Sequence, residues 1–122
     1  MTYVKINDVE YEALVSGLMK DSSWDERASK TINFAEGEMD YENASALFVD
    51  GATWSIITED EVTDFDEEGN PVGTHTERTE FDNSDYNLAG DITDHRDGRI
   101  SVKMGKLSDI EELIEEIYGG DL

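Results

Sequence analysis

The residues with the clearest chemical potential are the carboxylates that crowd into positions 59–68. Acidic residues occupy the first, third and fifth positions of a calcium-binding loop that would begin at Asp64, and Gly69 occupies the sixth. The twelfth position, where such a loop needs a bidentate glutamate, is His75, and Pro71 interrupts the segment. A hairpin turn explains this spacing better than a metal site. We therefore expect no bound metal and no other cofactor.

A second group combines one histidine with three carboxylates and has the residue types of a metal site or an acid–base pair. Its members are Asp91, Asp94, His95 and Asp97. No second histidine lies nearby, and a strand that ends before Asp94 would divide the group between a strand and a turn. The sequence has no phosphate-binding loop, nucleophile elbow or HExxH motif, and without cysteine it has no thiol chemistry. We therefore expect that the protein is not an enzyme.

The whole chain is strongly acidic. Its 122 residues include 31 Asp and Glu against 9 Lys and Arg, which gives a formal net charge of −22. This sign excludes direct nucleic-acid binding through phosphate contacts. The apolar runs are too short for a membrane span and the N-terminus lacks the apolar segment of a signal peptide, so we expect a cytoplasmic protein that binds no membrane. Aromatic residues make up 9% of the chain, in patterned segments, which predicts one folded domain over residues 1–122.

The elements that position these carboxylates are predicted from alternation and turn residues. Apolar residues on every second position of 3–15, around Asn7-Asp8, predict a hairpin. The other predicted elements are a strand at 31–34, a short helix after Asp40, a strand at 54–58, a long hairpin that turns at 68–71 and returns towards Phe81, a hairpin of 86–93 with 99–104, and a helix from Ser108 to Tyr118. Strands in hairpins predict the α+β class, with a twisted antiparallel sheet of about six or seven strands, a short middle helix and a C-terminal helix.

Two of these elements carry the densest negative charge. Seven of the ten residues from 59 to 68 are acidic. In the predicted C-terminal helix, glutamates recur four residues apart as like-charge pairs, and the later ones lie where the helix dipole prefers cations. Such unfavourable placement indicates that the charge serves a partner rather than stability. The predicted partner contacts are Glu59, Asp60, Glu61, Asp64, Asp66, Glu67, Glu68, Glu112, Glu115 and Glu116.

The residues alone leave three interpretations of the acidic surface open. It can be an ordinary solvated surface, a halophilic adaptation, or an imitation of a polyanion. Duplex DNA carries one charge per about 1.7 Å of its axis, whereas carboxylates on alternate residues of a strand recur only every ~6.7 Å. A polyanion mimic therefore needs two or three acidic elements side by side. Its partner would be a protein with a basic nucleic-acid-binding surface.

Basic residues gather in the last predicted hairpin, which carries four of the nine in the chain. They are Arg96, Arg99, Lys103 and Lys106. They either balance the charge of the acidic helix that follows or form a second contact surface for self-association. The sequence leaves the oligomeric state open.

Several stretches resemble small uncharacterised proteins of phages and prophages. They are Val4–Tyr11, Trp24–Lys30, Leu47–Gly51 and Asp82–Lys106. The small size, the acidity and the lack of cysteine are similar to those of anti-CRISPR proteins, phage-encoded inhibitors that often bind Cas nucleases in place of DNA. These resemblances imply a protein that acts in the cytoplasm of a bacterial host cell and that has no catalytic residues.

The leading functional prediction is therefore a phage-encoded stoichiometric inhibitor. It would be an acidic DNA mimic that blocks a nucleic-acid-binding host protein, with a Cas9-type CRISPR nuclease as the first candidate. The alternative is a small structural or tail-assembly protein of the phage particle. An assembly protein should bind other particle proteins through apolar and edge-strand contacts, whereas a mimic should stay small and bind through exposed charge that salt screens.

Overall fold

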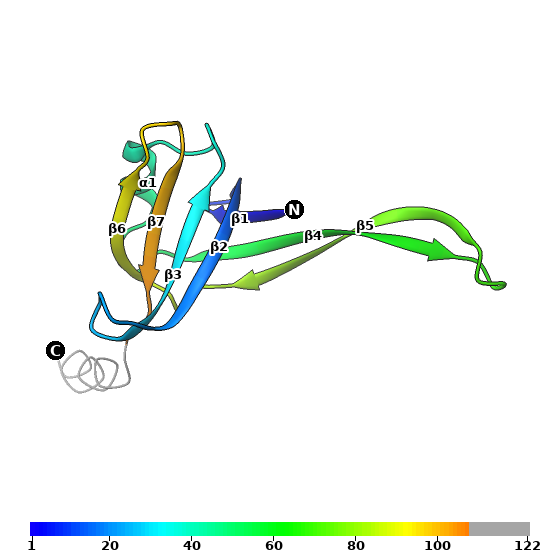
Figure 1. The fold of residues 1–122 in the computed structure, drawn as a ribbon, viewed down its shortest axis with the longest axis horizontal. Coiled ribbons are helices and arrows are strands. Elements are labelled where there is room, and N and C mark those ends of the chain that lie inside the picture. The colour runs from blue at the N-terminus through cyan, green and yellow to red at the C-terminus, as the bar shows by residue number, and fades with distance from the viewer. Residues whose placement is uncertain (108–122) are drawn as a thin grey trace.

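The computed structural model describes residues 1–107, which fold into seven strands and one short helix (Figure 1). All neighbouring strands are antiparallel, and the sheet order is β5-β4-β1-β2-β3-β7-β6. The predicted antiparallel sheet and short middle helix are confirmed, and the described chain is mostly β. The predicted helix from Ser108 to Tyr118 lies outside the described residues. The elements are β1 (Thr2–Ile6), β2 (Val9–Asp21), β3 (Arg27–Phe34), α1 (Tyr41–Leu47), β4 (Trp54–Phe65), β5 (Pro71–Asp82), β6 (Leu88–Asp94) and β7 (Ile100–Gly105).

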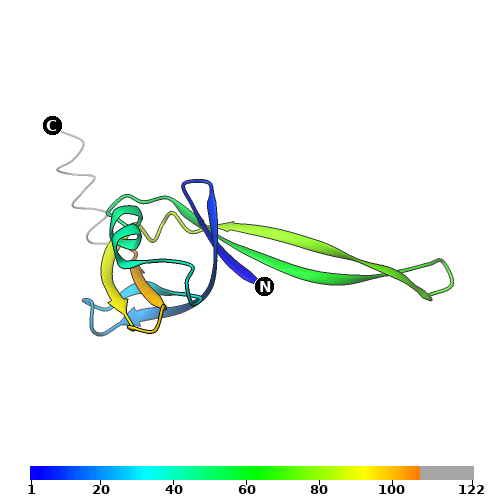
Figure 2. The same cartoon turned by 90° about the horizontal axis from the view of Figure 1, so that it is seen from above.

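The longest strand, β2, divides the sheet into two halves. Residues 9–12 of β2 pair with β1, whereas Ala13 and the residues after it pair with β3. β2 therefore belongs to both halves: its start pairs with the first half, β5-β4-β1, and the rest of it pairs with the second half, β3-β7-β6. Figures 1 and 2 show the strands of the second half running across the direction of β4 and β5. α1 packs against β6 and β7, so the bent sheet and the helix together enclose a core.

The core is built around a chain of aromatic contacts. The ring centroids of Phe34 and Phe48 are 5.8 Å apart, and those of Phe48 and Trp54 are 6.4 Å apart. Tyr11 packs edge-on against Phe34 at 5.9 Å. Strand β5 contributes no residue to the buried set. The buried core residues are Val4, Ile6, Ala13, Ile32, Phe34, Met39, Ala44, Phe48, Trp54, Ile100, Val102 and Met104.

Backbone geometry confirms two local predictions. Asn7 and Asp8 have φ values of +51° and +63°, which both lie in the left-handed region that a two-residue hairpin turn requires. Asp40 caps α1, because its carboxylate accepts a hydrogen bond from the N–H of Asn43 at 2.7 Å. These residues fix the register of the first hairpin and the first turn of the helix.

Strands β4 and β5 form a hairpin that extends far beyond the rest of the sheet (Figure 1). β4 pairs with β1 only as far as Thr58 opposite Thr2, whereas β4 and β5 pair with each other as far as Phe65 opposite Pro71. We call residues 59–78 the arm. No residue of the arm belongs to the buried core, and all twelve residues of β5 are exposed. The arm is therefore an extension of the sheet rather than a part of the packed body.

The arm differs from the sequence prediction in its boundaries. The sequence predicts a strand at 54–58 and then a long hairpin that turns at 68–71. The hairpin is confirmed, but its first strand is continuous with the 54–58 strand as β4, and its turn runs from Asp66 to Asn70. The Oδ1 atom of Asp66 accepts hydrogen bonds from the N–H groups of Glu68 and Asn70, each at 2.9 Å. Aspartate and glutamate have low strand propensity. Pairing with β5, which the turn residues predict, is what extends the strand through this segment.

Candidate functional site

The arm is a two-stranded ribbon whose side chains point to two opposite faces. Residues that lie opposite one another across an antiparallel pair share a face. We name the two faces after the basic residue that each carries. The Arg78 face carries Glu59, Glu61, Thr74, Thr76 and Arg78. The His75 face carries Asp60, Val62, Asp64, His75 and Glu77. The acidic residues of positions 59–68 are therefore divided between two faces instead of being gathered on one.

Arg78 lies at the base of the Arg78 face and joins the arm to β2. Its Nε donates to Oε1 of Glu59 at 2.7 Å, and its guanidinium also pairs with Glu10. The guanidinium carbon lies 6.0 Å from the ring centroid of Tyr3. The hydrogen bond with Glu10, followed by that with Glu59, raises the pKa of Arg78, and the bond from Arg78 lowers the pKa of Glu10. One fixed cation thus serves two carboxylates, which leaves the group negative.

His75 lies between two carboxylates on the second face. Its Nδ1 is 2.7 Å from Oδ1 of Asp64, and its Nε2 is 3.1 Å from Oε1 of Glu77. The hydrogen bond with Asp64, followed by that with Glu77, raises the pKa of His75. Asp60 lies directly opposite Glu77, and like charges in that position weaken strand pairing. The His75 face therefore stays negative even when the imidazole is protonated.

The remaining predicted contacts lie at the end of the arm or outside the described residues. Asp66 closes the turn, and Glu67 and Glu68 are exposed beside it. Glu61 accepts a hydrogen bond from the hydroxyl of Thr74 at 2.8 Å. All seven predicted contacts in β4 and its turn therefore lie on one ribbon. The three predicted contacts that lie outside the described residues are Glu112, Glu115 and Glu116.

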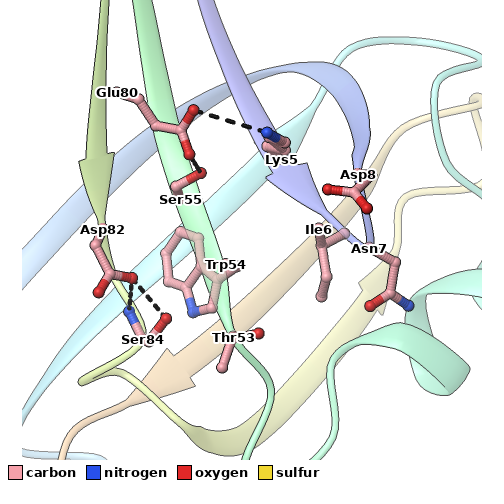
Figure 3. A pocket seen from close by; sticks show the side chains of 10 residues that line it. All are labelled: Lys5, Ile6, Asn7, Asp8, Thr53, Trp54, Ser55, Glu80, Asp82 and Ser84. Carbon is pink, nitrogen blue, oxygen red and sulfur yellow. Dashed lines mark hydrogen bonds and ion pairs between the residues drawn. The ribbon is translucent and has the colours of Figure 1, made fainter.

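A shallow hollow of about 420 Å³ lies over β1, the start of β4 and the end of β5 (Figure 3). Oε1 of Glu80 is 3.8 Å from Nζ of Lys5, and Oε2 accepts a hydrogen bond from the hydroxyl of Ser55 at 2.9 Å. The carboxylate of Asp82 accepts hydrogen bonds from the N–H and the hydroxyl of Ser84, at 3.0 and 2.6 Å. Because these polar groups bond to one another, the hollow is explained as the junction of β5, β4 and β1 rather than as a ligand site.

The second predicted group of titratable residues closes the turn between β6 and β7. Asp94 accepts a hydrogen bond from a main-chain N–H two residues later at 2.8 Å, and Asp97 pairs with Arg99 at 2.7 Å. The Nε2 atom of His95 lies 2.8 Å from the hydroxyl oxygen of Ser101, within hydrogen-bond distance. Within residues 1–107, no three histidine and carboxylate side chains are grouped so that they could hold a metal ion. Asp94, His95 and Asp97 thus make contacts within the β6–β7 hairpin.

A polar network on the outer side of the second half was not predicted from the sequence. Asp21 is buried and pairs with Lys103, and its carboxylate accepts hydrogen bonds from the hydroxyls of Ser23 at 2.5 Å and Ser29 at 2.9 Å. The bond from Lys103, followed by that from Ser23, strongly lowers the pKa of Asp21. The network holds the loop of Trp24 against β7. Its one local signal is the Asp-Ser-Ser turn sequence, because the lysine comes from a distant strand.

The basic residues of the last hairpin have partners within the second half of the sheet. Lys103 pairs with Asp21, and Arg99 pairs with Asp97. Local charge balance therefore explains these two residues better than a contact surface for self-association does.

Among the described elements, the arm is the one that carries the predicted partner contacts. Its single described helix, α1, is too short to span a bilayer. In comparisons with known proteins, the chain matches no family model, no curated protein and no solved structure.

Proposed function

We propose that this chain is a non-enzymatic binding protein that uses the arm to hold a basic partner protein, as a small structural or assembly protein of a phage particle. The observation that carries the proposal is the arm itself. Fixing the backbone of one residue costs about 1–2 kcal/mol, yet the arm adds no residue to the buried core. Contacts with another molecule would offset the entropy cost of ordering such an element, which burial in the core does not offset.

Two further features support an assembly role. β5 is an edge strand that is exposed along its whole length. On β2, the apolar side chains of Leu14, Leu18 and Met19 are 70%, 55% and 88% exposed. Edge strands and exposed apolar side chains are surfaces that protein partners cover. The proposal that the assembly is a phage particle follows from the resemblance described in the sequence analysis.

The charge of the arm predicts the sign of the partner. Arg78 and His75 balance only part of the carboxylates around them, and Glu67 and Glu68 extend the negative surface to the tip. A surface of one sign steers a partner of the opposite sign and rejects partners of its own sign. The partner surface is therefore rich in lysine and arginine.

The same charge supports a second candidate, an acidic DNA mimic that blocks a nucleic-acid-binding host protein such as a Cas9-type nuclease. The observation in its favour is that β4 and β5 bring acidic residues side by side, as Asp60 and Glu77 do. We place it second because the carboxylates point to two faces and because several of them bind Arg78 or His75. The resemblance in size and charge to anti-CRISPR proteins supports this candidate.

One pair of measurements separates the two candidates. Purified particles of a phage that encodes the chain are analysed by quantitative mass spectrometry, and the purified protein is titrated into Cas9–guide RNA with labelled target duplex at two salt concentrations. A fixed copy number in the particle, with no effect on DNA binding, supports the assembly role. Absence from the particle together with a salt-sensitive loss of DNA binding overturns it and supports the inhibitor.

A further inference from the structure

The free edge of β5 has the features of a strand-binding site. We infer that it binds an extended, lysine- or arginine-rich segment of the partner protein as an additional strand of the sheet. This inference rests on the proposed function and names the binding mode and the chemistry of the partner. It depends on three observations: which main-chain groups face outward, how the two edges of the sheet differ, and how the carboxylates flank the edge.

The register of the hairpin identifies the main-chain groups of β5 that face outward. The N–H of Asn83 donates to the carbonyl oxygen of Trp54 at 2.9 Å. Hydrogen-bonded pairs alternate along an antiparallel ladder, so every second residue of β5 before Asn83 bonds to β4. No strand lies beyond β5 in the sheet that residues 1–107 form. The residues that direct both main-chain groups away from β4 are Thr74, Thr76, Arg78, Glu80 and Asp82.

The two edges of the sheet differ in how they are protected. At the β6 edge, the N–H of Ala89 donates to the carboxylate of Asp50 at 2.9 Å, and the N–H of Gly51 donates to the carbonyl oxygen of Asn87 at 2.8 Å. The loop before β4 therefore covers this edge, and an irregular register between Ala89 and Ile92 interrupts it. β5 has neither kind of cover over its central residues. Its protection consists of Pro71 at its start and charged side chains along its length. A mostly negative edge repels an acidic strand but accepts a basic one.

Carboxylates flank the outward row on both faces of the ribbon. On β5 itself, Glu80 and Asp82 lie on the Arg78 face and Glu77 lies on the His75 face. Glu61 and Asp60 lie one strand further in, on β4. An added strand would place its side chains alternately on these two faces. Lysine and arginine side chains opposite Glu77, Glu80 and Asp82 therefore meet a carboxylate across the strands, an arrangement that stabilises pairing, whereas Arg78 disfavours a basic side chain directly opposite it. Phe81, which is 53% exposed, adds an apolar contact at the base of the edge.

Charge also decides against a second copy of the chain as the occupant. β5 carries three carboxylates against one arginine and one histidine, and each chain has a net charge of −22. Pairing of two β5 edges would bring these like-charged strands together, which costs free energy. A basic segment gains the same main-chain hydrogen bonds without this repulsion.

The test uses a blocked peptide of alternating lysine and valine, long enough to span residues 74–82. Spermine serves as a polycation that cannot form a strand. Affinities for the whole protein are measured by calorimetry, and amide hydrogen exchange of the arm is followed by NMR. The variants are Thr76→Pro, which removes an outward N–H, and its matched control Thr76→Ala, which keeps it. Thr74→Pro repeats the test one outward position away.

We expect Thr76→Pro to weaken peptide binding about tenfold relative to Thr76→Ala, because a hydrogen bond is lost. Spermine should bind both variants equally. The peptide, but not spermine, should protect the outward amides of Thr74, Thr76 and Arg78 in the natural protein. Retained protection of the Glu77 and Thr79 amides shows that the proline variants keep the hairpin.

Two results would overturn the inference. One is equal peptide affinity of the proline and alanine variants, which would mean that charge alone binds the peptide. The other is no peptide binding at low salt. Neither result bears on whether the chain is present in purified particles, which is the test of the proposed function. Failure of the inference can therefore be told apart from failure of the proposed function.

Discussion

At the scale of single residues, the indole of Trp24 packs over two glycines, Gly105 of β7 and Gly90 of β6, on the outer side of the second half of the sheet. A Cβ atom on Gly105 would lie 2.6 Å from the indole ring, and one on Gly90 would lie 2.9 Å from it. The guanidinium of Arg27 and the ammonium of Lys103 lie 5.2 and 6.0 Å from the ring centroid. The indole thus fills the space that a side chain at either glycine would need, so these two glycines are explained by packing.

Gly105→Ala should destabilise the protein by about 1–3 kcal/mol, because the added methyl group overlaps the indole and forces it to move. Urea unfolding followed by circular dichroism measures the free energy. Gly17→Ala is the matched control, since the nearest atoms to a Cβ there lie 3.7 Å away. In a Trp24→Ala background the Gly105 substitution should cost much less. An equal loss of stability in both backgrounds would show that overlap with the indole is not what destabilises the Gly105 variant.

At the scale of the element, His75 makes cross-strand contacts in the arm sensitive to pH. Its hydrogen bonds with Asp64 and then Glu77 raise its pKa. A raised pKa means that the protonated imidazole stabilises the paired arm. This contribution is fully present below the ordinary histidine pKa of about 6.5 and is lost as the pH rises through the raised value.

An NMR titration of the imidazole tests this assignment. We expect a His75 pKa above the ordinary value, and Asp64→Asn should move it back towards that value because the larger of the two hydrogen-bonded carboxylate contributions is gone. Glu67→Gln, in the turn, serves as the control and should leave the titration unchanged. A pKa that is the same in the natural protein and in Asp64→Asn would contradict the contact.

The elements that could be predicted from the sequence are those with local signals. The Asn7-Asp8 hairpin depends on two turn residues, and the cap at Asp40 depends on a hydrogen bond within four residues, so both were predicted correctly. The bend of β2 was not predicted, because the strand changes partner at Ala13 and neither partner strand is marked in its sequence. The acidic segment was found from composition, whereas its division between two faces required the register of β5.

The same distinction explains the candidate site. The hairpin of the arm was predicted from its turn residues, but no local pattern shows that its strands extend beyond the core. The partners of Arg78, which are Glu59 on the next strand and Glu10 on β2, depend on the strand order β5-β4-β1-β2. That order brings residues together that are far apart in the chain. Charge density could thus be predicted, and charge geometry could not.

At the scale of the whole molecule, the net charge of −22 opposes the compact state. Monovalent salt screens this repulsion, so the free energy of unfolding should rise with salt, by on the order of 1 kcal/mol for the shift from low to high concentration. Urea unfolding at several salt concentrations measures the effect. A double variant, Glu67→Lys with Glu68→Lys, should show a smaller rise. Stability that falls with salt would mean that attractive ion pairs such as Arg78–Glu10 outweigh the repulsion.

The central claim is that the arm binds the partner while the core only carries the arm. It is tested with a shortened chain in which an Asn-Gly turn joins Thr58 to Thr79, two residues that lie opposite each other in a hydrogen-bonded pair. The shortened chain keeps every buried core residue, so its unfolding free energy should stay within about 1 kcal/mol of the natural value.

The decisive measurement is a competition between the two chains. Natural and shortened chains are produced together in infected cells, and mass spectrometry gives their ratio in the lysate and in purified particles. The account predicts that the shortened chain is depleted at least about tenfold in the particles, which corresponds to a loss of ~1.4 kcal/mol of binding free energy. Equal incorporation of a folded shortened chain would contradict it, because the body of the sheet would then bind the partner without the arm.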